Sequence, residues 1–410
     1  MVSTGSTNDE GRSTNDEGRS TDDVGNPAKP VRDEDAFDVE AVAAWLREHA
    51  TLPEGWTVED LAGTPEVRQF RGGASNLTYL LRYPARDLIL RRPPTGAKAA
   101  SAHDMGREFR IQSALAPVFP YVPRMIGFCR DDSVIGSDFY VMEKLDGTIL
   151  RRELPWPLTD EEAARLCADA LDVLVALHSV DVAAVPELAR LGRGEGYVAR
   201  QVGGWVDRFA KARTDDTGDW SDVVAWIEAN QPADVAQRLI HNDFRLDNLV
   251  LAPDDSPRGS ALRIVGVLDW EMATVGDPLM DLGGMLSYWV EAGDDEFFQL
   301  FRRQPTTEPG MWTRAEFVER YCERMGFAIS PEQWRFYEVF GLFRLAVIAQ
   351  QIWYRYFHRQ TTNEAYAVFG PAVGYLETRC RRLVSTSSTS ESSRSTGEGS
   401  RSTGETDGER

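Results

Sequence analysis

Two short segments of the 410-residue chain hold the residues whose types and spacing could do chemistry. In the first (241–251, HNDFRLDNLVL), Asp243 follows a histidine by two residues, and Asn248 comes five residues later, before an apolar run. In the second (264–283), Asp269 ends a β-branched, apolar run. Phosphoryl transfer from a nucleotide needs a base near the acceptor hydroxyl and oxygen ligands for Mg²⁺. Because Mg²⁺ takes few protein ligands, one Asn and one Asp suffice. The pattern indicates a kinase, with Asp243 as the base and Asn248 and Asp269 as metal ligands.

The spacing of these residues resembles that of a known family. The matching residues are His241-Asn242-Asp243, Asn248, Asp269-Trp270 and Gly276-Asp277-Pro278-Leu279-Met280-Asp281-Leu282. They are similar to the signature of the aminoglycoside phosphotransferase and choline kinase family, in which glycine usually stands at the position of Asn242. Three separate blocks match in order and spacing, and the resemblance covers about 55–384. Within the family, the two segments look closest to the branch that is fused, in some proteins, to an acyl-CoA dehydrogenase.

This resemblance implies an α+β, bilobal, protein-kinase-like fold. Its small N-lobe would hold an antiparallel sheet plus a helix, and its larger C-lobe would be mostly helical. The resemblance also implies three supporting residues. His241 would brace the catalytic loop against the strand that bears Asp269, Asp281 would accept hydrogen bonds from the backbone of that loop, and Asp277 would cap the turn before Pro278.

The nucleotide clamp is expected at the end of the third strand, where protein kinases carry a lysine. Here DLILRR (87–92) offers Arg91 and Arg92, which strand alternation places on opposite faces. Alignment with the kinase V-A-I-K pattern favours Arg91, which can hold phosphate bidentately, with Glu108 on the following helix as its ion-pair partner. The alternative is that Arg91 is a surface charge on an edge strand.

Two further segments are predicted to bind the nucleotide. The first hairpin carries a glycine-rich turn that would offer backbone and side-chain donors to the phosphates. Its candidate residues are Gly72, Gly73, Ser75 and Asn76. The end of the fifth strand resembles a kinase hinge, where backbone groups would pair with the purine edge and an apolar side chain would line the pocket. Its candidate residues are Met142, Glu143 and Leu145.

Composition divides the chain into four parts. The N-terminal tail (1–36) repeats STNDEGR, the C-terminal tail (385–410) repeats RSTGE, and both are polar and acidic, which is typical of disorder. Between them we expect an N-lobe at 37–146, beginning with a helix near Asp38, and a C-lobe at 147–384. Strands are predicted at 67–72, 76–83, 87–92, 125–131 and 138–145, with a helix at 105–118 and a strand pair at 249–251 and 264–268.

Charge and apolar patterning exclude several classes of function. The net charge is −20, and because the tails carry −5 and −2, the body keeps −13. Such a charge argues against binding to nucleic acid or to an anionic membrane. No run approaches ~18 apolar residues, and the N-terminus lacks a basic-then-apolar signal, so we expect a cytoplasmic protein. The four cysteines are far apart and are expected to be reduced core thiols.

The resemblance implies ATP or GTP as the phosphate donor, Mg²⁺ as the metal and a small hydroxylated molecule as the acceptor. The dehydrogenase-fused branch suggests a hydroxyacyl-CoA or a hydroxy acid. Residues 339–384 contain six arginines and only two glutamates. This local positive charge is either an anion-binding wall or merely helix surface. Alternatives are an antibiotic phosphotransferase of the aminoglycoside type and an inactive, nucleotide-binding pseudokinase. A protein kinase is disfavoured, because Asp269 to Gly276 is too short for an activation loop. No pattern predicts an oligomeric state.

Overall fold

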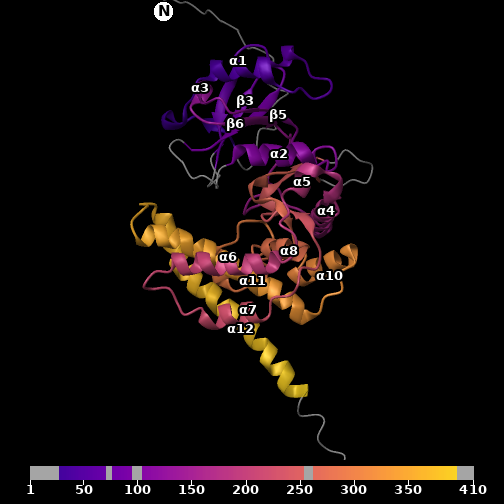
Figure 1. The fold of residues 1–410 in the computed structure, drawn as a ribbon, viewed down its shortest axis with the longest axis vertical. Coiled ribbons are helices and arrows are strands. Elements are labelled where there is room, and N and C mark those ends of the chain that lie inside the picture. Colours follow the sequence, from indigo (N-terminus) through magenta and orange to yellow (C-terminus); the bar gives the residue numbers. More distant parts are fainter. Residues whose placement is uncertain (1–26, 71–75, 95–103, 254–261, 395–410) are drawn as a thin grey trace, which may run out of the picture.

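The computed structural model describes residues 27–70, 76–94, 104–253 and 262–394. A sheet-containing N-terminal part lies at one end of the molecule and a mostly helical part at the other, as Figure 1 shows. The sheet is antiparallel and six-stranded, in the order β1-β2-β3-β4-β6-β5. Its strands are β1 (Lys29–Pro30), β2 (Glu66–Gln69), β3 (Leu77–Arg82), β4 (Asp87–Arg92), β5 (Met125–Cys129) and β6 (Phe139–Glu143). The predicted α+β, bilobal class is confirmed.

Strand alternation gives the sheet two apolar faces. Helix α1 (Val39–His49) covers the face that carries Leu88 and Leu90. Helix α2 (Met105–Leu115) covers the opposite face, where Ile89 packs with Met105 and Met142. Because β4 lies between β3 and β6, it is an internal strand, which excludes the edge-strand interpretation of its arginines.

The C-terminal part is built on helices packed around one apolar core. Its longer helices are α4 (Asp160–His178), α6 (Tyr197–Ala212), α7 (Ser221–Ala229), α8 (Pro278–Leu286), α10 (Arg314–Met325), α11 (Pro331–Phe357) and α12 (Phe369–Arg394). Shorter ones are α5 (Pro186–Ala189) and α9 (Glu296–Leu300), whereas the short helix α3 (Asp132–Ile135) lies beside α1 in the N-terminal part. Helix α11 packs against α6, α8 and α12, and its apolar residues enter the core. Within the described ranges, no helix has the length and apolar character needed to cross a membrane.

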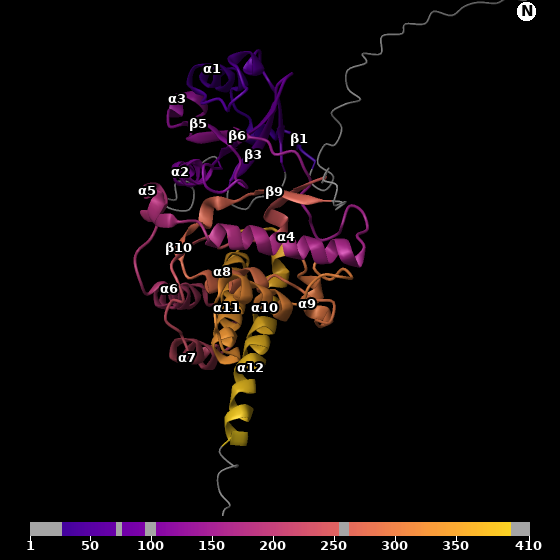
Figure 2. The same cartoon turned by 90° about the vertical axis from the view of Figure 1, so that its right-hand side faces the viewer.

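Two short strand pairs lie beside these helices and carry the candidate chemistry. Strand β8 (Leu249–Ala252) pairs with β9 (Arg263–Val267), as predicted, and β7 (Arg238–Ile240) pairs with β10 (Thr274–Gly276). Figure 2 shows α4 running across the molecule next to β9. The candidate loop between β7 and β8 is therefore anchored by a strand at each end.

Helices and strands extend beyond the domain boundaries expected at 36 and 385. Strand β1 pairs with β2, and the side chain of Asp35 is buried and accepts a hydrogen bond from Gln69 Nε2 at 2.8 Å. The backbone carbonyl of Asp35 also accepts bonds from Tyr79 and Arg92. The polar composition of this segment concealed a role in pairing and capping the sheet. At the other end, α12 continues to Arg394.

Candidate active site

The loop after β7 is held by one buried carboxylate. Asp281, in α8, accepts hydrogen bonds from the backbone N–H groups of His241 and Asn242, both at 2.7 Å. Burial opposes its ionisation, but the hydrogen bond from His178 and the charges nearby hold the pKa of Asp281 below its usual value. Asp281 therefore supports the loop as predicted. His178 is fully buried and also contacts Tyr321, so its role is structural.

His241 links the loop to the strand that precedes Asp269. Its Nε2 lies 3.1 Å from the carbonyl of Leu268, and its Nδ1 lies 3.3 Å from the backbone N–H of Asp243. The two bonds are consistent with one neutral tautomer, in which Nε2 donates and Nδ1 accepts. Burial lowers the pKa of His241, and the ring packs against Trp270. The predicted bracing contact is present.

Asn242 occupies the position at which the family has glycine, and its backbone shows why glycine suits the site. Its φ is +65°, in the left-handed region, which asparagine tolerates better than most side chains. The side chain then forms bonds that glycine cannot. Its Nδ2 donates to the carbonyl of Met272 at 3.1 Å, and its Oδ1 lies 3.3 Å from the hydroxyl of Tyr197. Asn242 therefore fits the left-handed backbone and adds two side-chain contacts to the loop.

Asp243 lies in a partly enclosed position, with its side chain 25% exposed. Asn248 Nδ2 donates to the carboxylate at 3.0 Å, and Arg245 lies 3.3 Å from the same oxygen. Burial raises the pKa of Asp243 to about 6, and Arg245 opposes the shift. Proton acceptors work best when their pKa is near the working pH. The position and pKa of this carboxylate therefore suit a general base.

Asp269 lies beside the loop, on a backbone that few residues adopt. Its φ is +68°, and its side chain is 35% exposed. The backbone N–H of Leu268 donates to the carbonyl of Asn248 at 2.8 Å, which brings the two predicted metal ligands to the same end of the β8–β9 pair. A non-glycine residue with a left-handed backbone is strained and persists only where the surrounding structure holds it. Such residues cluster at functional sites.

Arg91 joins the sheet to this site. It forms the predicted ion pair with the buried carboxylate of Glu108, donates to the hydroxyl of Tyr140 at 3.2 Å, and lies 3.5 Å from Asp269 Oδ1. Burial opposes its charge, but Glu108, Tyr140 and Asp269 raise the pKa of Arg91 well above its usual value. Arg92 points to the opposite face, where it is buried against Asp35 and Tyr79.

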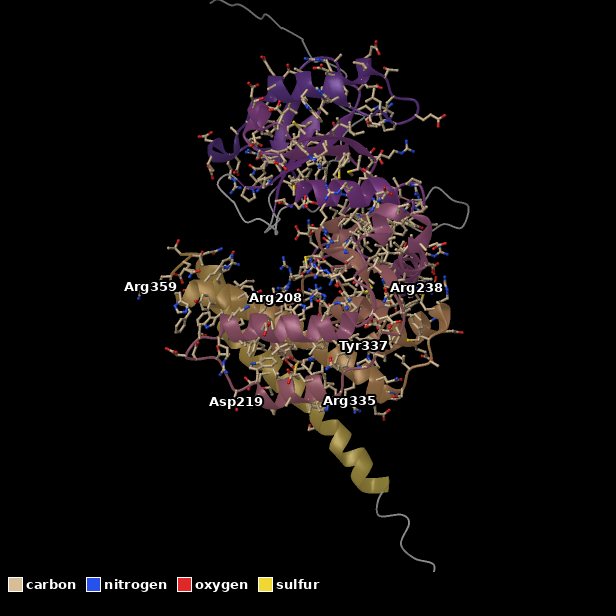
Figure 3. All side chains as sticks on the ribbon, viewed as in Figure 1. Arg208, Asp219, Arg238, Arg335, Tyr337 and Arg359 are labelled. Atoms are coloured by element: carbon tan, nitrogen blue, oxygen red, sulfur yellow. The ribbon has the colours of Figure 1, made fainter. Side chains whose placement is uncertain are left out.

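Asp277 begins α8 as its N-cap. Its carboxylate accepts bonds from the N–H groups of Leu279 at 2.8 Å and Val235 at 2.7 Å. Tyr337, labelled in Figure 3 within the helical part, donates to it at 3.3 Å. Burial raises the pKa of Asp277 to about 6. The predicted capping role is confirmed.

The predicted nucleotide segments are only partly described. Gly72, Gly73 and Ser75 lie outside the described residues, whereas Asn76 is buried at the start of β3. In the predicted hinge, Met142 is buried on the α2 face of the sheet. The carboxylate of Glu143 accepts a hydrogen bond from the backbone N–H of Arg124 at 2.9 Å. The backbone N–H of Glu143 donates to the backbone carbonyl of Arg124. Leu145 packs against Gly266 of β9, where a Cβ would meet its Cδ1 at 2.0 Å. The predicted hinge segment therefore packs directly against the β8–β9 pair.

Sequence reasoning missed several arginines around the site. Arg245 pairs with Asp247 at 3.1 Å and lies over the ring of Tyr288, besides contacting Asp243. Arg344, in α11, donates to the carbonyl of Asn242 at 2.7 Å. Arg107, in α2, donates to two carbonyls that follow Asp269. The excess of arginines at 339–384 was the one signal available for Arg344, and the contacts of Arg107 depend on tertiary structure.

The arrangement suits Mg²⁺. Within the described ranges, no group of three or more His, Cys, Asp or Glu side chains is arranged to hold a metal ion. Mg²⁺ would fit the pair formed by the Asn248 amide and the Asp269 carboxylate, because it commonly binds one or two protein oxygens and fills its remaining positions with water and phosphates. Asn248 and Asp269 would hold it, and it would neutralise charge on the phosphates.

Comparison with known proteins identifies the family. Residues 66–318 match the model of the phosphotransferase enzyme family (APH). The chain is 32% identical over 356 residues to acyl-CoA dehydrogenase family member 11 of Homo sapiens, a match that covers 84% of this chain and 42% of that protein. It is 32% identical over 368 residues to family member 10 of Mus musculus, covering 89% and 32%. The chain thus spans less than half the length of these relatives, and the resemblance to the dehydrogenase-fused branch is confirmed.

Solved structures agree in fold. A putative aminoglycoside phosphotransferase from Ralstonia eutropha superimposes with a TM-score of 0.70 and 28% identity, covering 86% of this chain and 99% of that one. Choline kinase from Cryptosporidium parvum superimposes with a TM-score of 0.56 over 85% of this chain and 97% of that one. At 11% identity, the second likeness shows the fold alone. The chain belongs to the phosphotransferase enzyme family, with a protein-kinase-like fold.

Proposed function

We propose that the chain is a small-molecule kinase that transfers the γ-phosphate of ATP or GTP to a hydroxyl group of an anionic metabolite, such as a hydroxy acid or a hydroxyacyl-CoA. The observation that carries the proposal is the position of Asp243, whose pKa is raised to about 6 and whose carboxylate is oriented by Asn248. Asp243 would align the acceptor hydroxyl and accept its proton late in the transfer, as the acceptor oxygen bonds to phosphorus and the bond to the diphosphate breaks.

The nucleotide would lie between the sheet and the β8–β9 pair. Arg91 would hold phosphate oxygens from the sheet side, because its guanidinium is buried, charged and oriented by Glu108. Asn248 and Asp269 would hold Mg²⁺ from the other side. The purine would lie against the predicted hinge formed by Met142, Glu143 and Leu145.

The arginines around Asp243 support an anionic acceptor. Arg245 and Arg344 bound the loop, and Arg151 donates to the carbonyl of Asp247 at 3.3 Å. Burial lowers the pKa of Arg151, and the nearby charge of the exposed Arg303 lowers it further. Such a wall would repel the cationic groups of an aminoglycoside and attract a carboxylate or phosphate. The names of the acyl-CoA dehydrogenase relatives are consistent with an acyl-CoA-related acceptor.

Arg91 in place of the kinase lysine and Asn242 in place of glycine are the two departures that could indicate a pseudokinase, but neither residue favours one. Arg91 forms the ion pair with Glu108 that an active clamp would need, and Asn242 adopts the backbone conformation that glycine would provide. A nucleotide sensor would bind ATP or GTP without forming a phosphorylated product.

The experiment measures diphosphate release and, by mass spectrometry, phosphorylated product. The acceptors are a series of hydroxy acids, their CoA thioesters, the matching uncharged amides and one aminoglycoside, each tested with ATP and with GTP. We expect product from an anionic acceptor and much less from its amide. Nucleotide binding without product from any acceptor would support the sensor instead, and preferential phosphorylation of the aminoglycoside would overturn the acceptor class.

Two arginines that share one ring provide a matched pair of variants. Arg344 and Arg208 both lie over the ring of Trp205, at 5.3 and 4.7 Å, but only Arg344 contacts the catalytic loop. Arg208, labelled in Figure 3, is exposed on α6. Arg344→Met should raise the KM for the anionic acceptor by about tenfold, the value of one charged hydrogen bond. Arg208→Met should leave it unchanged, and equal effects would count against an anion-binding wall.

A further inference from the structure

Arg107 makes the most direct side-chain link between helix α2 and the segment that follows Asp269. Its Nη1 donates to the carbonyl of Glu271 at 2.6 Å, and its Nη2 donates to the carbonyl of Ala273. These carbonyls belong to a short 3₁₀ turn (Trp270–Met272) and to the residue that ends it. One guanidinium therefore holds the middle and the C-terminal end of the turn that Asp269 precedes.

The neighbouring residue of α2 reaches the same aspartate by another route. Glu108 pairs with Arg91, and Arg91 lies 3.5 Å from the Asp269 carboxylate. Helix α2 thus contacts the side chain of Asp269 through Arg91 and the backbone after Asp269 through Arg107. Both connections are made by charged hydrogen bonds, which are stronger and more directional than neutral ones.

The backbone of Asp269 needs such support. Its φ of +68° is unfavourable for a residue with a Cβ and is kept only where the surroundings determine it. If the turn after Asp269 relaxed, the carboxylate would rotate away from Asn248, which directly precedes β8. Burial lowers the pKa of Arg107 somewhat, but an arginine remains charged at neutral pH.

We propose that Arg107 is a positioning residue that holds the Asp269 carboxylate in its metal-binding orientation and fixes α2 against the C-terminal part. The inference rests on the proposed kinase function, in which Asp269 binds Mg²⁺. It assigns to α2 a second contact, in addition to the Arg91–Glu108 pair, that sets the geometry of the metal site.

The test compares Arg107→Met, which keeps the aliphatic stem but removes every donor, with Arg107→Lys and with Arg110→Met. Arg110 lies on the same helix, is exposed, and is 3.7 Å from Asp104, so its variant controls for changes to the helix surface. Three quantities are measured for each protein: the Mg²⁺ concentration that half-saturates ATP binding, ATP binding in EDTA, and the melting temperature.

For Arg107→Met we expect the half-saturating Mg²⁺ concentration to rise by about tenfold, which corresponds to loss of a charged hydrogen bond, with ATP binding in EDTA within about twofold of wild type. Arg107→Lys should recover part of the loss, and Arg110→Met should resemble wild type. Hydrogen exchange at 270–273 should also be faster in Arg107→Met. An unchanged Mg²⁺ dependence in folded Arg107→Met would overturn the inference while leaving the kinase proposal intact. A wild-type protein whose ATP binding did not depend on Mg²⁺ would overturn both.

Discussion

The side-chain amide of Asn248 donates to both the carboxylate and the backbone carbonyl of Asp243, at 3.0 and 2.9 Å. Because both partners are acceptors, the NH₂ end of the amide must face Asp243. The oxygen of Asn248 is then left for a cation on the other side. One residue thus orients the candidate base and contributes a candidate metal ligand, which ties the two functions to a single rotamer.

The pH profile should reflect the raised pKa of Asp243. A base acts in its deprotonated form, and burial raises the pKa of this carboxyl to about 6. Below that pH, kcat/KM for the nucleotide, which reports groups of the free enzyme, should fall about tenfold per pH unit, and above it the profile should level off. Unchanged circular dichroism from about pH 5.5 to 7.5 would exclude unfolding as the cause of this limb. Asp277, whose pKa is also raised to about 6, would not promote unfolding in acid, because its protonation favours the folded state.

Asn248→Asp offers a variant of the same prediction. It keeps an oxygen ligand but replaces a donor to Asp243 with a like charge, which raises the pKa of a neighbouring carboxyl. The acidic limb of the profile should therefore move to higher pH. A limb at the same pH in both proteins would mean that another group is responsible for it.

Asp269→Ala should weaken Mg²⁺-dependent nucleotide binding together with turnover, since this carboxylate would join the metal to the phosphates. The measurement is a titration of Mg²⁺ against ATP binding, with ATP binding in EDTA as the control for the rest of the pocket. If metal dependence were retained, Asp269 would not be a ligand.

Arg91 and Arg92 should affect different properties. Arg91→Ala should raise the nucleotide KM and lower turnover, and Arg91→Lys should still lose about 1–3 kcal/mol of transition-state stabilisation, because lysine lacks the planar fork that the site holds. Arg92 is buried, with bonds to Tyr79 and to the carbonyl of Asp35. Arg92→Ala should therefore lower the free energy of unfolding by about 2 kcal/mol. Denaturant unfolding and steady-state kinetics on both variants check this. Equal kinetic effects from the two would contradict the clamp assignment.

Two N-terminal truncations should differ in stability. Removing 1–26 should leave the melting temperature unchanged, because the composition of that segment gives it little apolar surface to bury. Removing 1–36 also takes away β1 and the buried Asp35, together with its bonds to Gln69, Tyr79 and Arg92. We expect that deletion to lower the melting temperature by several degrees, corresponding to about 2 kcal/mol. Identical melting curves would show that β1 contributes nothing to the sheet.

Strand alternation and the family resemblance predicted part of the site. Strand alternation placed Arg91 and Arg92 on opposite faces, and the family resemblance implied that Asp281 accepts hydrogen bonds from the backbone of the loop. The role of Arg92 could not be predicted, because its partner Asp35 lies in a polar segment whose pairing leaves no apolar pattern. Arg107 was missed for a similar reason. Its acceptors are backbone carbonyls, which carry no sequence signal, more than 160 residues away.

The central claim is that Asp243 is the base of a phosphotransfer site, and one measurement tests it most directly. Phosphorylated product and nucleotide affinity are determined for wild type and Asp243→Asn with the acceptor that gives product. Loss of the base should reduce turnover by at least about 10²-fold, because a positioned acid–base group contributes that much or more. Nucleotide affinity should remain nearly unchanged, since Asp243 would face the acceptor. Near wild-type turnover in Asp243→Asn would contradict the account.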